Sequence, residues 1–266
     1  MIGSCALFGY NALQTLYIPI MVMLFALIFR GVAFEFRHHN QKTAHWNLIF
    51  GISSLLASLA QGVALGSLIG GLGITEDNYQ GNVWGWFTPF SVLVALGVVT
   101  GYTLLGATYL MIKTEGAIRR ISIDHSYAAA ILEIVILSAV VIWASRFNPY
   151  FATRWADKET GAYLDLFLIL AIFAFSMLMW ALRNGFELSA FFWSVIISMA
   201  IFTAITIGYY PFMVPASIAL TDAASSSKTL IFMLSGIGFL IPVMLVYSGY
   251  QYLVFRGKVK MNEHRN

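Results

Sequence analysis

The stretch PFSVLVALGVVTGYTLLGATYLMI, residues 89–112, contains no charged side chain and is long enough to cross a lipid bilayer. A helix needs about 20 predominantly apolar residues to span the hydrocarbon core. Similar runs recur along the whole chain, separated by polar segments. We therefore predict an all-α, polytopic membrane protein with seven full transmembrane helices, at about residues 14–34, 47–73, 89–112, 126–146, 163–182, 188–210 and 229–255.

The composition agrees with this class. Of 266 residues, 59% are hydrophobic and only 10% are charged, whereas about 25% are charged in an ordinary soluble domain. Residues 93–99 and 167–173 are apolar at nearly every position, which excludes the alternating pattern of a membrane β-barrel. We expect one transmembrane domain over residues 1–266, in which residues 1–12 form an N-terminal partial helix that is too short to span.

The distribution of positive charge predicts the orientation. Eleven Lys and Arg residues follow the first, third and fifth spans or lie in the C-terminal tail, and four lie on the opposite side. Cytoplasmic loops carry the excess of positive charge, so the C-terminus is predicted to be cytoplasmic. Arg146, Arg154 and Lys158 lie on the other side, in or next to the 147–162 loop, and run against this trend.

Glycines recur every four residues at Gly62, Gly66 and Gly70, and again at Gly97 and Gly101. Such spacing places small residues on one helix face, where two helices can approach closely in lipid. We expect close helix packing at both motifs.

Ionisable groups inside a membrane are costly and are candidates for function. Arg30 and Glu35 lie near the inner end of the first full span, and Glu133 is the deepest carboxylate, in the inner half of its predicted span. Arg30 is interpreted either as the partner of a carboxylate or as an arginine that reaches to the interface. Glu133 is interpreted either as a proton carrier or as a neutral acid bonded to a neighbouring helix.

The remaining polar groups predict no catalytic, cofactor-binding or metal-ligating residue. Lys113, Glu115, Arg119 and Arg120 form a mixed-charge cluster beside the third span, which is typical of a solvated face. The single cysteine, Cys5, excludes a cysteine-held cluster, and no histidine lies in the middle of a predicted span. With a net charge of only +3, no nucleic-acid partner is expected. Periodicity alone leaves a transporter and an oxidase subunit as alternatives.

Three stretches resemble subunit II of the cytochrome bd family of quinol oxidases: LFALIFRGVAFEFR (24–37), WFTPFSVLVALGVVTGYTLLGATYLMIKTEG (86–116), and residues 210–258, from YPFMVPASIALTDAASS to SGYQYLVFRGK. Their order and separation extend the resemblance over nearly the whole chain. The family's GFDLG-like and WDGNETW-like motifs do not occur here. The chain is therefore expected to resemble a subunit that lacks the first span and part of the second.

The resemblance implies a fold of two four-helix bundles with a peripheral last helix. It also implies a heteromeric enzyme of the aerobic respiratory chain, in a bacterial plasma (inner) membrane, that oxidises quinol and reduces dioxygen to water. The b-type and d-type haems belong to the partner subunit I, and this chain is expected to bind none alone. A small accessory subunit and membrane lipid are further possible partners.

Matched position by position, Arg30 and Glu35 fall in the family's RGVAFEFR segment, and Lys113 and Glu115 in its KTEG segment. With Glu133, these residues are candidates for a proton route from the cytoplasm, in which Arg30 would fix a carboxylate. A secondary transporter, with Pro242 and Glu133 near its substrate site, and a purely structural membrane subunit remain the alternatives.

Overall fold

A computed structural model describes residues 2–39, 43–71, 74–75, 78–79, 84–210, 212–214, 218–219 and 227–254. Eight helices account for nearly all of them: α1 (Ile2–His39), α2 (Thr43–Gly70), α3 (Pro89–Lys113), α4 (Gly116–Phe147), α5 (Pro149–Ala156), α6 (Lys158–Asn184), α7 (Glu187–Tyr209) and α9 (Ser227–Val254). Two short antiparallel pairs join them: β1 (Ile74–Thr75) with β2 (Asn78–Tyr79), and β3 (Phe212–Val214) with β4 (Ile218–Ala219).

Seven of the helices are long and apolar enough to cross a membrane, which confirms the predicted number of spans. Two details differ from the prediction. Residues 2–12 are not a separate partial helix but continue into the first span as α1, because residues 13–15 hold no proline or glycine that would end it. The fourth span begins at Gly116, about ten residues before the predicted start at residue 126. The charged residues Arg119, Arg120 and Asp124 interrupt the apolar run but are part of the helix.

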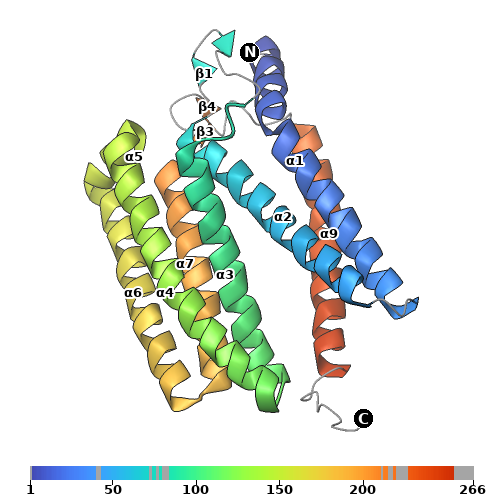
Figure 1. Ribbon diagram of the computed structural model, residues 1–266. Helices are drawn as coiled ribbons and strands as arrows, with labels where there is room; N and C mark the ends of the chain where they lie inside the picture. Colours follow the sequence, from blue (N-terminus) through green and yellow to red (C-terminus); the bar gives the residue numbers. More distant parts are fainter. Residues whose placement is uncertain are drawn as a thin grey trace.

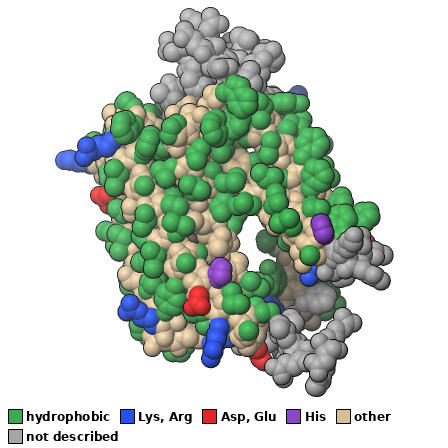
Figure 2. All heavy atoms as spheres, viewed as in Figure 1, with side chains coloured by type: hydrophobic (Ala, Val, Ile, Leu, Met, Phe, Trp, Pro, Cys, Tyr) green, Lys and Arg blue, Asp and Glu red, His purple; other side chains and the backbone are tan. Residues whose placement is uncertain are grey.

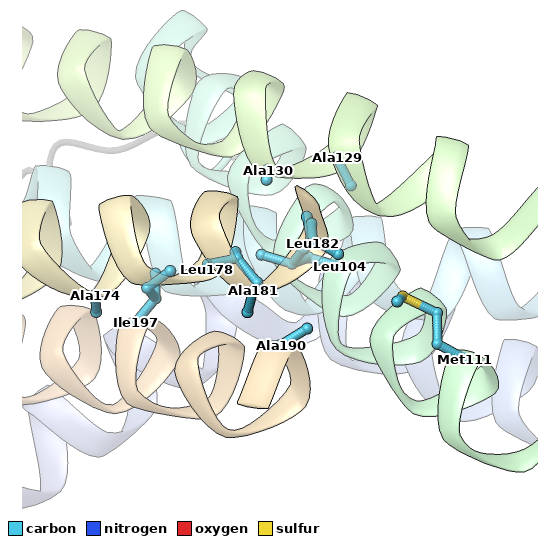
Figure 3. Close-up of a cluster of buried hydrophobic side chains, with 10 residues drawn as sticks. All are labelled: Leu104, Met111, Ala129, Ala130, Ala174, Leu178, Ala181, Leu182, Ala190 and Ile197. Carbon is cyan, nitrogen blue, oxygen red and sulfur yellow. The ribbon is translucent and has the colours of Figure 1, made fainter. Parts of the chain in front are cut away.

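Helices α3, α4, α6 and α7 form an antiparallel four-helix bundle (Figure 1). Its centre is built largely from small side chains, and Figure 3 shows residues from all four helices converging there. Leu104 on α3 and Leu178 on α6 are at most 2% exposed and fill the space that the surrounding alanines leave. Alanine at helix contacts lets the backbones approach, which in lipid increases van der Waals contact.

Glycines fix the α3–α4 and α6–α7 turns at one end of the bundle, which is named the inner end after the predicted orientation. Gly116, between α3 and α4, has a φ of +70°, and Gly185, which ends α6, has a φ of +71°. At the second turn the N–H of Phe186 donates to the carbonyl of Ala181, which closes a Schellman-type cap. Side chains with a Cβ rarely adopt this left-handed backbone, so glycine permits both reversals.

The predicted glycine packing is confirmed. A Cβ on Gly62 would lie 2.4 Å from the Cα of Ala95, and one on Gly66 would lie 2.6 Å from the Cα of Ser91. Helix α2 therefore crosses α3 with backbone against backbone. The other face of α2 packs against α1, so these two helices form a pair that is attached to the bundle through α2 (Figure 1).

The short helix α5 covers the end of the bundle that lies opposite the inner turns. The Asn148 side chain caps it by accepting from the N–H groups of Tyr150 and Phe151, and Pro149 occupies its first turn. Asn148 also donates to the Ile69 carbonyl at 3.3 Å, and Tyr209 donates its hydroxyl to the same oxygen at 3.0 Å. This carbonyl thus joins α2, the start of α5 and α7 at one end of the molecule.

The last helix, α9, is packed differently from the others. Every described side chain between Lys228 and Val254 is exposed within this chain, and Tyr252 makes an edge contact with Tyr109 on α3. The visible surface of the bundle is also mainly hydrophobic, and most of its charged groups lie towards the ends of the helices (Figure 2). Both features are typical of a protein whose surface faces lipid or other membrane helices.

Candidate functional site

The five predicted site residues do not form one cluster. Arg30 and Glu35 lie on α1, which packs against α2, whereas Glu133 lies on α4 in the bundle. Lys113 ends α3 and Glu115 precedes α4. Of the five, only Glu133 is buried; Lys113 is half-buried and the others are exposed.

Glu133 is 6% exposed and is the one ionisable residue among the buried polar side chains that the structure describes. It lies 17 residues after the start of α4 at Gly116 and 14 before its end at Phe147. It is therefore near the middle of its helix. A carboxyl group at this depth requires a hydrogen-bond partner, because lipid supplies none.

That partner is Thr100 on α3. Its hydroxyl donates to Glu133 Oε2 and also lies 2.9 Å from the carbonyl oxygen of Gly97. The opposite side of the carboxyl is bounded by Gly101, where a Cβ would lie 3.3 Å from Oε1. Because Gly101 has no side chain, it leaves room for the Glu133 carboxyl group.

Thr100 is not predicted directly from the sequence, because it is 33 residues from Glu133 and lies in an otherwise apolar run. A signal was nevertheless available. Thr100 lies between Gly97 and Gly101, and the predicted close approach at these glycines places a helix against this part of α3. A threonine at such a contact is the natural partner for a carboxylate on the neighbouring helix.

A second group of polar contacts lies nearer the inner turns. Thr108 and Ser194 join α3 to α7 through their hydroxyl oxygens at 3.1 Å, and Ser126 donates to the sulfur of Met111 at 3.6 Å. Leu104 lies on α3 midway between Thr100 and Thr108, four residues from each. Among the described side chains, no hydrogen-bonded path therefore connects the inner group with Glu133.

Arg30 lies on the face of α1 that meets α2. It is four residues after Ala26 and three before Ala33, which are 4% and 0% exposed, and this spacing places all three on one side of the helix. Its own side chain is exposed and has no hydrogen bond or ion pair with the side chains that the structure describes. Glu35, five residues further on, points to a different side of α1.

An ion pair that sequence reasoning missed closes the inner end of the bundle. Arg119 Nε lies 2.6 Å from Glu187 Oε1 and joins the first turn of α4 to that of α7. From the sequence, Arg119 is predicted to lie in a solvated cluster, because Glu187 is 68 residues away along the chain. Lys113 and Glu115 lie at this same end, on either side of Thr114, which caps α3.

The two histidine side chains that the structure describes are both exposed. His45 is exposed near the start of α2, and His125 is exposed on α4 with its Nδ1 2.7 Å from the Ile121 carbonyl. The side chains of His38, His39 and His264, and that of Cys5, lie outside the described residues. No buried histidine and no metal-binding group of His, Cys, Asp or Glu occurs in the described part of the chain.

Comparison with known proteins identifies the family. Residues 6–255 match the family described as cytochrome bd terminal oxidase subunit II. The chain is 27% identical over 286 residues to cytochrome bd-I ubiquinol oxidase subunit 2 of Escherichia coli (strain K12), covering 93% of this chain and 75% of the relative. It is 25% identical over 287 residues to the probable cytochrome oxidase subunit 2 of Haemophilus influenzae, covering 92% and 75%.

A solved structure agrees with the fold. The bd oxidase from Geobacillus thermodenitrificans superposes with a TM-score of 0.76 and 17% sequence identity, over 96% of this chain and 77% of that one. Because the family match over residues 6–255 includes all seven spans, this chain belongs to the cytochrome bd terminal oxidase subunit II family, whose members are parts of an oxidoreductase complex.

Proposed function

We propose that this chain is the haem-free subunit II of a quinol oxidase in a bacterial plasma membrane, where it assembles with a haem-bearing subunit I. The complex would oxidise quinol and reduce dioxygen to water. The observation that carries this proposal is the family match over residues 6–255, in a chain whose described interior holds no histidine. In this proposal the redox groups belong to the partner, and this chain supports it.

The surface supports a membrane-embedded partner. Gln61 on α2 and Tyr102 on α3 are exposed and hydrogen-bonded to each other at 3.0 Å, and Arg30 is exposed on α1. All three lie within membrane spans. Polar groups at such positions face protein or water rather than lipid, because lipid cannot satisfy them. We infer that protein covers the face formed by α1, α2 and α3.

The second part of the proposal is a proton route from the cytoplasm. Arg30 and Glu35 on α1, and Lys113 and Glu115 at the inner end of the bundle, would form its entrance, and Glu133 is the candidate at mid-depth. The C-terminal ends of α1, α3, α6 and α9 lie on the same side of the molecule (Figure 1). Most of the Lys and Arg residues occur in the sequence at or just after these ends, which supports a cytoplasmic position for this side and for the C-terminus.

Removing this chain tests the first part. With subunit I produced alone, we expect the loss of most membrane-bound d-type haem and of quinol oxidase activity, and both should return when this chain is supplied. Full haem content and full activity without this chain would contradict the proposal. Loss of the proton route alone would not change haem content, so the two parts are separable.

Arg30 tests the second part. Arg30→Ala in the assembled oxidase should lower turnover and proton uptake while haem content stays unchanged, and Arg30→Lys should restore part of both because it keeps the charge. Arg120→Ala, which also removes an exposed arginine, is the matched control. Equal proton uptake in the Arg30→Ala and Arg120→Ala proteins would reduce the proposal to a purely structural subunit.

The transporter alternative receives no support. It requires interrupted helices around a site near the midplane. Helix α9 continues through Pro242 from Ser227 to Val254, and its described side chains are exposed rather than gathered with Glu133 in the bundle.

A further inference from the structure

We propose that Glu133 and Thr100 form a proton-binding pair, in which the Thr100 hydroxyl satisfies both the ionised and the protonated carboxyl without movement of α3 or α4. This inference deepens the proposed function, since it assigns to one candidate residue how it would hold a proton. It is tested without relying on haem or a partner.

The Thr100 hydroxyl can form a hydrogen bond with the Glu133 carboxyl in either protonation state. The Thr100 hydroxyl has one hydrogen to donate and two lone pairs, and it lies within bonding distance of Glu133 Oε2 and of the Gly97 carbonyl. An ionised carboxylate can only accept, and in that state Thr100 donates to it. A protonated carboxyl can donate, and in that state Glu133 donates to Thr100 while the hydroxyl hydrogen turns towards Gly97.

The two states therefore differ by one proton and one hydroxyl rotation. The proton arrives from water and forms an O–H bond at a carboxyl oxygen, and its return to water breaks the same bond. No other bond is made or broken. Because the heavy atoms need not move, Glu133 Oε2 and the Thr100 hydroxyl remain partners in both states, and the loss of such a partner would cost about 1–3 kcal/mol.

Helix packing at Gly97 and Gly101 fixes both sides of the Thr100–Glu133 pair. Gly97 lies in contact distance of α4, where a Cβ would be 3.4 Å from Ile136 Cγ2, and Gly101 provides the room for Glu133 Oε1. The helices are thus held together on both sides of Thr100. The contact between Thr100 and Glu133 therefore lies between two packed helices and not in a flexible loop.

On the helices that pack against α4, no described charged side chain competes with Thr100 for the Glu133 carboxyl. Helix α4 packs against α3, α5 and α6, and the buried residues of α3 and α6 are apolar apart from serine and threonine. The ionisable groups on these helices are Tyr102, Tyr109 and Lys113 on α3, Tyr150 and Arg154 on α5, and Lys158, Glu159, Tyr163, Asp165 and Arg183 on α6.

These groups are engaged elsewhere or lie near helix ends. Tyr102 bonds to Gln61, Asp165 accepts from Trp155 Nε1 at 3.0 Å, and Arg154 donates to the Tyr210 carbonyl at 2.8 Å. Thr100 is therefore the described polar side chain that responds to the charge on Glu133. It acts as a positioning residue and not as a proton carrier.

Infrared spectroscopy of the full chain in detergent tests the pair, because a protonated carboxyl has a carbonyl stretch apart from that of the carboxylate. We expect a band equivalent to one carboxyl per chain that titrates with pH and is lost in Glu133→Gln. Thr100→Ser should preserve its position, and Thr100→Val should shift it to the frequency of a weaker hydrogen bond. Thr103→Val, which removes an exposed threonine on the same helix, should change nothing.

Two results would overturn the inference. One is a spectrum in which Glu133→Gln removes no titrating band. The other is a band that responds equally to Thr100→Val and Thr103→Val, since this would show that the hydroxyl does not face the carboxyl. Either result would contradict the Glu133–Thr100 pair but not the proposed assembly with subunit I. Conversely, if the infrared band behaves as expected but the chain forms no complex with a haem-bearing subunit, only the proposed function is rejected.

Discussion

A Cβ on Gly62 would lie only 2.4 Å from the Cα of Ala95, so α2 and α3 touch through their backbones. No atom of a flexible side chain lies at this point that could move aside. One turn further along α2, a Cβ on Gly66 would lie 2.6 Å from the Cα of Ser91. These two contacts attach the α1–α2 pair, and with it Arg30, to the four-helix bundle.

Gly62→Ala should therefore separate α2 from α3. Overpacking of a closely packed interior costs about 1–3 kcal/mol, and here the backbone itself would have to shift. The measurement is the midpoint of thermal unfolding in detergent together with the yield of folded protein. Gly51→Ala is the matched control on the same helix, because no heavy atom lies within 4 Å of its Cβ position. Equal behaviour of the two variants would show that α2 does not cross α3 at Gly62.

The Arg119–Glu187 pair should contribute modestly to stability. Its side chains are 35% and 18% exposed, so solvent screens the attraction, and a coupling energy of about 0.5–1 kcal/mol is expected. A double-mutant cycle with Arg119→Gln and Glu187→Gln measures it, and the coupling should decrease at high salt. Arg120→Gln serves as a control next to the pair. A coupling energy of zero at low salt would mean that α4 and α7 are not joined here.

Asp157 predicts a dependence of stability on pH. Its carboxylate caps α6 by accepting from the Thr160 hydroxyl at 2.8 Å and from the Thr160 N–H at 3.3 Å. These hydrogen bonds, with a smaller effect of Arg154, hold the pKa of Asp157 below its ordinary value. A carboxyl group with a lowered pKa in the folded state stabilises the protein above the pKa of the unfolded chain, and this stabilisation is lost as the pH falls through the folded pKa.

Asp157→Asn separates this charge effect from the cap itself, because asparagine can also accept from the helix N–H groups. We expect the unfolding temperature of the original protein to fall more steeply in acid than that of Asp157→Asn. Asp157→Ala should be less stable than Asp157→Asn at neutral pH. Parallel curves for the aspartate and asparagine proteins would exclude a contribution of the Asp157 charge.

The sequence was sufficient to predict the seven spans, since membrane helices are defined by the length of their apolar runs. It also predicted the close packing at Gly62, Gly66, Gly97 and Gly101, because small residues at four-residue spacing have a direct geometric meaning. Span ends were less accurate. Arg119 and Asp124 break the apolar run near the start of α4 although the helix itself continues through them.

The pairs between helices could not be predicted. Thr100 and Glu133 are 33 residues apart, and Arg119 and Glu187 are 68 apart, so nothing local in the sequence distinguishes these partners from other threonines and glutamates. Helix α5 was overlooked for another reason. Asn148 and Pro149 form a typical start for a helix, but the segment that follows is too short to show periodicity.

We propose that this membrane chain works with a haem-bearing partner. The most direct test is to purify the tagged chain from its native membrane in mild detergent and to record its absorption spectrum and polypeptide composition. We predict a second subunit in equal amount and the bands of b-type and d-type haem. A colourless chain that is purified alone, from membranes that retain active quinol oxidase, would contradict the claim.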